Sequence, residues 1–376
     1  MEYSWSLLII SIFVYIVSIL VAKPQITYNN PQRNNVKKGT IAFFILLMIN
    51  SVFAFWAADT YHSWEGFIIA NQYQSFEILG YEQYYNWLAT AVGNDYFLWR
   101  ACIWIPACLF MYWSAKRLDL LNRNFLVAML LFGSFLSYTR GMLGHTMLVF
   151  GAVLFMDKKS NTLTKIIGLS IVCVSYYFHK SMYVNIIFAV LALFPFGKKT
   201  IIASFIAFPF LTAIATYLID GIVSGQIDMA LGEGVGGVGD ETASYASEER
   251  MEVNVYGMIK KIIIYIPEYL TLFYLYYKVI VQRIFDKDKK EKVYTYLFRL
   301  TYVAIYIASL FYFVETSSWI YERFKYMGFF PLVFVLGAVW SKEKYSSKWI
   351  KVIILLQALS ILYILSYKLY KWYGMS

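Results

Sequence analysis

Charged and titratable side chains interrupt two of the most apolar stretches of this chain. In residues 136–150, LSYTRGMLGHTMLVF, Arg140 and His145 are five positions apart, and in a second stretch His179 and Lys180 are adjacent. Ionisable groups inside apolar stretches mark ligand or proton-transfer sites by default. Arginine binds phosphate bidentately, lysine binds it as a point charge, and histidine titrates near neutral pH. These two pairs therefore predict a site for an anionic substrate.

Other polar side chains near the ends of apolar stretches are candidates for the same site. They are Asp59, His62, Glu65, Arg250, Glu315, Glu322, Arg323 and Lys325. Cations and carboxylates set partly into a bilayer fit an anionic, lipid-linked substrate. Ordinary structural roles stay open. Arg140 could pair with a carboxylate between two helices, Asp59 could end a helix, and Arg323 could anchor one at the interface. His62 and Glu65 could share a helical face or be solvated.

No metal or cofactor is expected. The three histidines are scattered and lack HxH or HExxH spacing. The glycine-rich stretch 232–239 contains the G-x-G-x-x-G spacing of dinucleotide sites, but no strand is expected before it and no GK[ST] of a P-loop follows. The D-x-D within 286–292 lies in a lysine-rich run and is expected to be solvated. We predict a reaction that needs no nucleotide.

The whole chain has the composition of an integral membrane protein. Its 376 residues are 60% hydrophobic and 20% aromatic, and the mean hydropathy is +0.56. Repeated apolar runs of about eighteen or more residues predict an all-α, polytopic protein with one membrane domain covering 1–376. The first run, 5–22, lacks a basic leader and a cleavage pattern, so we expect a retained helix.

The placement of charge predicts the topology. Most of the 33 lysines and arginines fall in six short loops, at 23–38, 116–123, 157–165, 197–199, 282–292 and 342–351. By contrast, 58–96 has no lysine or arginine, and in 222–257 Arg250 stands alone among acids. The positive-inside rule then makes the six loops cytoplasmic and the two acidic segments extracytoplasmic. The net charge of +10 is thus a topology signal, and no nucleic-acid partner is expected.

This assignment requires twelve crossings, with both termini outside. The expected spans are 5–22, 39–57, 97–115, 125–139, 142–156, 166–178, 182–196, 200–221, 258–281, 293–314, 326–341 and 350–370. Lys368 and Lys371 would then lie outside, so eleven crossings is the alternative. Segment 58–96 is amphipathic and aromatic, and would either lie over the site or anchor helices. Segment 222–257 is expected to be a glycine-rich, acidic loop.

The interrupted stretches predict two short hairpins that open outward. As one helix, 124–156 would be about 50 Å long against a hydrocarbon core of about 30 Å. It would also place Arg140 at mid-bilayer, at a cost of roughly 2.5–3.5 kcal/mol. Two helices that meet at Arg140 avoid both problems, with Gly141 and Gly144 in a tight turn. The stretch 166–196 has the same form, although its basic pair could merely snorkel to the interface.

The order of these features resembles the EpsG-like branch of the Wzy-type polysaccharide polymerases. The resembling features are Asp59 and Tyr61 after the second helix, then FEILGYEQYYNWLATAVGNDYFLW, an isolated arginine at the start of a helix ending in KK, YYFHKSMYVNIIF, and YERFKYMGFF. The resemblance spans most of the chain. One departure is that Gly141 and His145 stand where the family has an alanine-rich helix.

The resemblance implies a specific activity and location. Members join undecaprenyl-pyrophosphate-linked oligosaccharide repeats at the outer leaflet of the bacterial inner membrane, with the active site facing the periplasm. Their architecture is similar to that of the membrane-embedded GT-C glycosyltransferases. A flippase and a chain-length regulator are the implied protein partners, and the lipid-linked oligosaccharide and membrane lipid are the others. Whether the product is O-antigen, capsule or exopolysaccharide stays open.

The chemistry of such a reaction assigns roles to the candidate residues. Negative charge develops on the departing pyrophosphate, and Arg140 with Lys180 or Arg323 could stabilise it. A base must accept the proton of the attacking hydroxyl, and Asp59, His145 and His179 are the candidates. The further candidates for contact with the sugar or pyrophosphate are Arg250, Glu65, His62 and Tyr61.

Two other classes of protein remain as alternatives. A transporter or flippase for a lipid-linked sugar would need alternating access, usually between repeated halves with broken helices. A membrane acyltransferase that modifies a polysaccharide would place its histidine toward a cytoplasmic donor. In the twelve-crossing topology the histidines lie on the outer side, which favours the polymerase.

Overall fold

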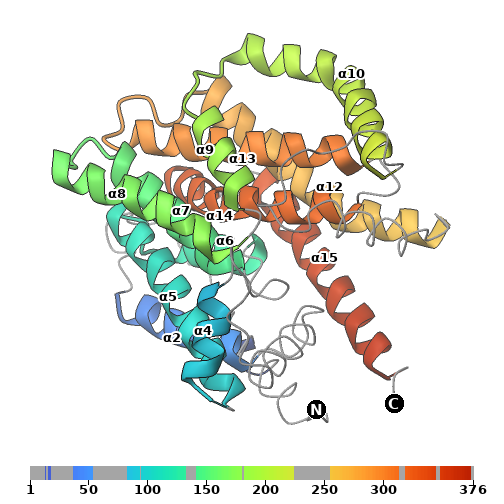
Figure 1. Cartoon of the computed structure of the whole chain (residues 1–376). Coiled ribbons are helices and arrows are strands. Elements are labelled where there is room, and N and C mark those ends of the chain that lie inside the picture. The colour runs from blue at the N-terminus through green and yellow to red at the C-terminus, as the bar shows by residue number, and fades with distance from the viewer. Residues whose placement is uncertain are drawn as a thin grey trace.

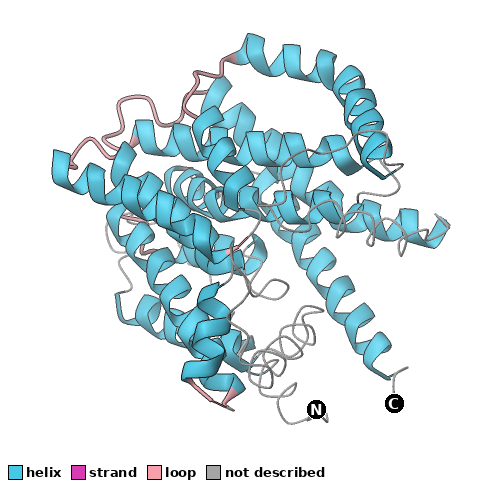
Figure 2. Cartoon of the chain, in the orientation of Figure 1, coloured by secondary structure: helices cyan, strands magenta, loops and turns pink. Residues whose placement is uncertain are grey.

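The computed structural model is helical throughout the residues that it describes. These residues are 13, 16–17, 37–53, 83–93, 95–132, 141–179, 182–223, 255–312, 318–343 and 348–373. Within these ranges there is no strand (Figure 2). The all-α fold class is therefore confirmed for the described part of the chain.

The described residues form fourteen helical elements, arranged in one bundle (Figure 1). In the first half they are α2 Lys37–Phe53, α4 Gln83–Ala91, α5 Tyr96–Arg117, α6 Arg123–Phe132, α7 Gly141–Met156, α8 Thr162–Ser175, the 3₁₀ turn η2 Tyr176–Phe178 and α9 Met182–Leu191. In the second half they are α10 Lys198–Val223, α12 Val255–Tyr276, the π-turn η3 Tyr277–Val281, α13 Glu291–Tyr312, α14 Ser318–Lys342 and α15 Lys348–Tyr373.

Each expected span from 39–57 onward overlaps one of these helices, whereas 5–22 lies almost wholly outside the described residues. The overlap is partial for 39–57, 125–139 and 182–196, whose described helices end at Phe53, Phe132 and Leu191. Four described stretches are long and apolar enough to cross a membrane: Tyr96–Arg117, Lys198–Tyr217, Glu291–Phe311 and Phe324–Lys342. Several of the other helices are apolar but shorter. The chain is thus an α-helical protein with the character of a membrane protein.

Capping residues explain where two of the helices begin. The Asp95 side chain accepts a hydrogen bond from Leu98 N at 2.9 Å at the start of α5. The Asn161 side chain accepts one from Thr164 N at 2.8 Å at the start of α8. Each cap satisfies a backbone N–H that has no partner inside the first helical turn. The basic loops that precede or follow these helices are therefore short and well defined.

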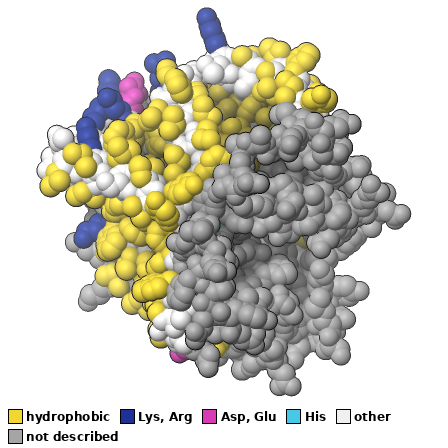
Figure 3. All heavy atoms as spheres, viewed as in Figure 1, with side chains coloured by type: hydrophobic (Ala, Val, Ile, Leu, Met, Phe, Trp, Pro, Cys, Tyr) yellow, Lys and Arg dark blue, Asp and Glu magenta, His cyan; other side chains and the backbone are white. Residues whose placement is uncertain are grey.

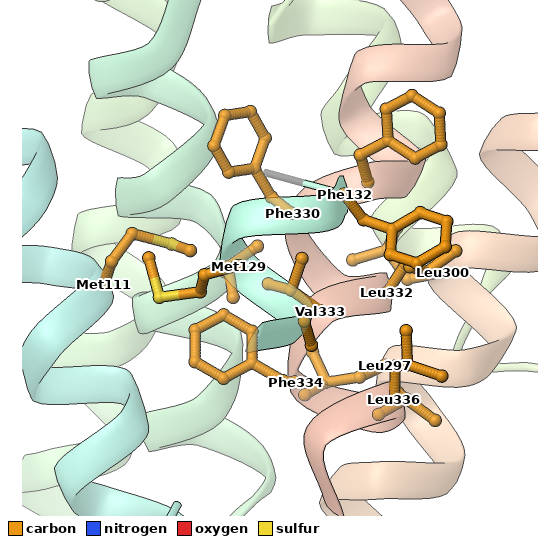
Figure 4. Packing of buried hydrophobic residues seen from close by; sticks show 14 of the residues in the cluster. Met111, Met129, Phe132, Leu297, Leu300, Phe330, Leu332, Val333, Phe334 and Leu336 are labelled. Atoms are coloured by element: carbon orange, nitrogen blue, oxygen red, sulfur yellow. The ribbon is translucent and has the colours of Figure 1, made fainter. Parts of the chain in front are cut away.

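Helix α14 is the centre of the bundle. Its residues 332–336 are fully buried, and it contacts α13 on one side and α6 on another. Figure 4 shows side chains from these helices interlocking around Val333 and Phe334. Gly337 allows this closeness, because a Cβ there would lie 2.9 Å from Phe125 Cα of α6. The core is therefore built around a helix from late in the chain.

The two arms of the first predicted hairpin are described, but its turn is not. Helix α6 is described to Phe132 and α7 from Gly141, and the expected turn at Arg140 lies outside the described residues. Among the described residues α6 contacts mainly α14, and α7 contacts mainly α8 and α5, so α6 and α7 are not packed as a pair. Burial against α14 draws α6 away from α7.

Gly144 is not in a turn, which corrects the sequence prediction. It lies inside α7, where a Cβ would come within 2.9 Å of the Met182 side chain and 3.2 Å of the Ser175 carbonyl oxygen. The glycine is required because α7 crosses the junction between α8 and α9 at close range. Its conformational freedom has no role in a helix.

Candidate functional site

Most of the predicted site residues lie outside the described part of the chain. They are Asp59, Tyr61, His62, Glu65, Arg140, Lys180 and Arg250. The backbone of Arg323 belongs to α14, but its side chain is not among the described ones. His145 and His179 are described in full. The site can therefore be built from these two histidines and from the polar groups around them.

His145 is buried at the junction of three helices. On α7, its Nε2 lies 2.9 Å from Nδ2 of Asn185 on α9, and its ring stacks on Phe330 of α14 at 5.4 Å between centroids. With the amide nitrogen of Asn185 facing the ring, Nε2 is the acceptor of this hydrogen bond. Asn185 Oδ1, also buried, has no hydrogen-bond partner among the described residues. A role for His145 as a base would require Nε2 to release Asn185.

His179 marks the break in the second interrupted stretch. It is buried, it adopts an extended conformation after η2, and its carbonyl accepts a hydrogen bond from Met182 N at 2.9 Å. Helix α4, the described part of segment 58–96, lies beside this break, where the rings of Tyr84 and Phe178 make an edge contact at 5.0 Å. The break at His179 and the aromatic segment therefore meet in space.

A buried ion pair joins α12 to α14. Lys325 Nζ lies 3.4 Å from a carboxylate oxygen of Glu268, and both side chains are buried. The ammonium also lies 4.4 Å from the ring centroid of Tyr265 and 5.4 Å from that of Phe329. Such cation–π contacts stabilise a desolvated cation. Lys325 was a sequence candidate, whereas Glu268 was missed.

Both of these pairs contact α14. Lys325 and Phe330 are five positions apart, which is about 7.5 Å along a helix and about 140° around it, so the two pairs lie on different faces of α14. We call His145, Asn185, Glu268 and Lys325 together the α14 polar cluster. His145, Asn185 and Lys325 lie in the N-terminal halves of their helices, whereas Glu268 lies just past the middle of α12. The histidine and the lysine are therefore nearer than the carboxylate to the helix ends opposite to the basic loops.

A second group that sequence reasoning missed lies on α5. Arg100 is buried, and its guanidinium donates a hydrogen bond of 3.4 Å to the Tyr96 hydroxyl. The guanidinium carbon also lies 5.8 Å from the centroid of the Tyr96 ring. The Tyr96 ring stacks on Trp99 at 5.7 Å. Arginine remains charged even when buried. The signal was available, because Arg100 and Glu268 each interrupt an apolar run as Arg140 does.

The described residues contain no group of three or more His, Cys, Asp or Glu side chains placed to hold a metal ion. No protein-family model, curated protein or solved structure matches the chain. The site is therefore interpreted from its own residues and from the sequence resemblance described above.

The opposite end of the bundle carries a different arrangement of charge. Asp157, in the loop after α7, is buried. Its carboxylate accepts hydrogen bonds from Arg117 Nε at 2.7 Å and from Lys290 Nζ at 2.9 Å. Burial raises the pKa of this carboxyl, but hydrogen bonds from Lys290 and the Lys159 backbone, with the nearby positive charges, bring the pKa below its ordinary value. Asp157 therefore stays ionised and ties α5, α7 and α13 together.

Proposed function

We propose that this chain is a glycosyltransferase of the bacterial inner membrane that joins undecaprenyl-pyrophosphate-linked oligosaccharide repeats at the outer face. The α14 polar cluster is the observation that carries the proposal. It sets a cation, a carboxylate and a histidine inside the bundle. The cation and the histidine lie in the halves of their helices that the charge distribution assigns to the outside. The sequence resemblance supports the same activity.

The energetics of the cluster favour a functional role. Removing a lysine and a glutamate from water costs several kcal/mol each, and a well-packed apolar pair is often equally stable or more so. Two apolar side chains at these positions could therefore stabilise the fold as well as the Glu268–Lys325 ion pair does. Groups of this kind inside a membrane domain are typical of substrate and proton pathways.

The proposed reaction uses the cations as electrostatic catalysts. The bond between the anomeric carbon of the growing chain and the pyrophosphate oxygen breaks. A bond forms between that carbon and a hydroxyl oxygen of the next lipid-linked repeat, and the hydroxyl proton passes to a base. Arg140, with Lys180 or Arg323, would stabilise the charge on the leaving pyrophosphate. Asp59, His145 and His179 are the proposed bases.

The architecture belongs to the same proposal. Twelve crossings, both termini outside and a GT-C-like arrangement are consistent with four long apolar helices and several shorter ones. Shorter helices need not cross fully where their ends line a cavity shielded by neighbouring helices. A flippase that delivers the lipid-linked repeat and a chain-length regulator are the proposed partners.

Arg140→Ala tests the proposal directly. We expect the elongation rate of purified protein supplied with lipid-linked repeats to fall by about 100-fold or more. Removal of one donor that stabilises a developing negative charge typically slows a reaction by this factor. In cells, single lipid-linked repeats should accumulate while long polymer disappears. Lys198→Ala, which removes an exposed cation at the start of α10, is the matched control and should elongate normally. Normal polymer length in the Arg140 variant would remove this residue from the mechanism.

A transporter of a lipid-linked sugar is the second candidate, favoured by the break at His179 between α8 and α9. Broken helices at a binding site are typical of transporters. Reconstitution of the protein into liposomes separates the two functions. Movement of lipid-linked repeats across the bilayer without elongation would establish the transporter and overturn the polymerase.

A further inference from the structure

An open surface hollow lined mainly by lysines lies at the basic end of the bundle. It has a volume of about 400 Å³ and is formed by the loop after α7 and the loop before α13. Its lining residues are Lys158, Lys159, Lys287, Asp288, Lys289 and Glu291. We call this the lysine cavity. Figure 3 shows lysine and arginine side chains gathered at one edge of the molecule, directly beside a broad apolar surface.

The two loops hold the lysines on a rigid base. Asp157 binds Lys290 across the two loops, and its Oδ1 accepts a hydrogen bond from Lys159 N at 3.1 Å. Asp288 forms an ion pair with Lys342 at 2.6 Å, and its side chain also accepts a hydrogen bond from Lys290 N at 2.8 Å. The cavity lysines are therefore displayed from backbone fixed by internal hydrogen bonds.

The lining carries more positive than negative charge, because four lysines face two carboxylates, Asp288 and Glu291. Asp288 is already paired with Lys342. Among the described residues, none of the four cavity lysines makes an ion pair. Lys287 also adopts a left-handed backbone conformation, with φ of 67°, where a non-glycine residue costs of order 1 kcal/mol.

An apolar surface begins where the cavity ends. Helix α8 starts immediately after the loop that carries Lys158 and Lys159, and its Leu163 and Ile166 are 65% and 56% exposed. This face continues along the helix as an unpartnered apolar stripe. A soluble anion would use the lysines alone, whereas a lipid would use the lysines and the stripe together.

We propose that the lysine cavity binds the headgroup of an anionic phospholipid from the cytoplasmic leaflet, with the acyl chains along α8. Basic pockets beside membrane helices on the cytoplasmic side bind such headgroups. Four lysines match a headgroup with two phosphates better than one with a single phosphate, so diphosphatidylglycerol is the preferred ligand. Binding at this cavity is independent of the proposed catalytic activity.

The test compares two variants of equal charge. The cavity variant replaces Lys158, Lys159, Lys287 and Lys289 by Gln. The control variant replaces Lys198, Lys199, Lys348 and Lys351, four exposed lysines outside the cavity, by Gln. Binding of diphosphatidylglycerol, phosphatidylcholine and inorganic pyrophosphate to the purified full chain is measured by native mass spectrometry, with a thermal melt of each variant to establish folding.

The wild-type chain should bind diphosphatidylglycerol at least about tenfold more tightly than phosphatidylcholine. The cavity variant should lose that preference, and the control variant should keep it. An equal loss in both variants would show attraction to general surface charge and overturn the site, as would an unchanged cavity variant. Pyrophosphate binding as tight as that of the lipid would identify a soluble anion and overturn the lipid proposal. If the fourfold variant fails to fold, Lys158→Gln/Lys159→Gln is tested against Lys198→Gln/Lys199→Gln by the same criteria.

Discussion

Asp157 is the residue on which the basic end of the bundle depends. Its carboxylate is buried and holds cations from two other helical segments, Arg117 at the end of α5 and Lys290 before α13. Lys290 is itself nearly buried. Loss of the carboxylate would leave that ammonium without its partner inside the protein.

We expect Asp157→Asn to destabilise the protein by about 3 kcal/mol, which is the cost of removing one partner of a buried ion pair and leaving the other charge buried. The melting temperature of the purified protein in detergent measures the effect. Asp286→Asn is the matched control, because Asp286 is exposed in the neighbouring loop. Equal melting temperatures for the two variants would contradict the role of Asp157.

The lowered pKa of Asp157 predicts how this contribution depends on pH. A carboxyl whose pKa is lower in the folded than in the unfolded protein stabilises the fold above the unfolded value, here 3.8, and ceases to do so as pH falls through the folded value. The difference in melting temperature between wild type and Asp157→Asn should therefore be constant near neutral pH and shrink below about pH 4. A difference that grows on acidification would contradict this sign.

At the same scale, sequence reasoning found some of the site and missed its partners. His145 stood out because it interrupts an apolar run, but nothing local indicates that Asn185 and Phe330 would surround it. Glu268 follows the same rule as Arg140 and could have been found. Its pairing with Lys325 depends on how α12 and α14 pack, which hydropathy does not encode.

At the scale of elements, α7 and α8 pack closely against one another. A Cβ on Gly151 would lie 2.5 Å from the Gly168 carbonyl oxygen, so the two backbones are nearly in contact. Small residues are what allow helices to approach in this way. The loop with Lys158 and Lys159 connects this pair, so the separation of the two helices also sets the position of those lysines.

Gly151→Ala should force the pair apart and destabilise the protein by about 1–3 kcal/mol, as overpacking does. Gly197→Ala is the matched control, because a Cβ there meets nothing within 4 Å. Melting temperatures of the two purified variants give the measurement. If Gly151→Ala melts with the wild type, the close contact of the two helices does not contribute to stability.

Apolar run length predicted where helices occur because burial of backbone polar groups leaves few other structures for such runs. It did not predict which helices pack together. Gly144 shows why. It leaves room for Met182 and Ser175, which are far away in the sequence and would be too close to a Cβ at this position. A turn and a close helix contact both select glycine, and the sequence alone does not separate them.

At the scale of the molecule, the separation of charge predicts the orientation in the membrane. The lysines and arginines paired with Asp157 and Asp288 lie at one end, and His145 and Lys325 lie in the opposite halves of α7 and α14. The chain would lie with its basic end in the cytoplasm, where anionic lipids and the positive-inside rule favour it.

Single cysteines placed in a variant without Cys102, Cys108 and Cys173 test this orientation. Ala91→Cys, at the exposed end of α4, should react with an impermeant maleimide from outside intact cells, and Lys198→Cys only after the membrane is opened. Detergent-opened cells, in which both positions should react, control for accessibility. Reaction of both cysteines from the same side would contradict the topology.

The central place of α14 has a consequence for how the protein is made. This helix begins at residue 318 of a chain that is synthesised from its N-terminus. The faces of α6, α7 and α13 that pack against α14 stay uncovered until α14 has been synthesised. A ribosome that stops before this point releases a chain with most of its helices, no closed core, and neither Lys325 nor Phe330 to complete the polar cluster. The packing of α6, α7 and α13 against α14 therefore forms late in synthesis, before only that of α15 against α12 and α6.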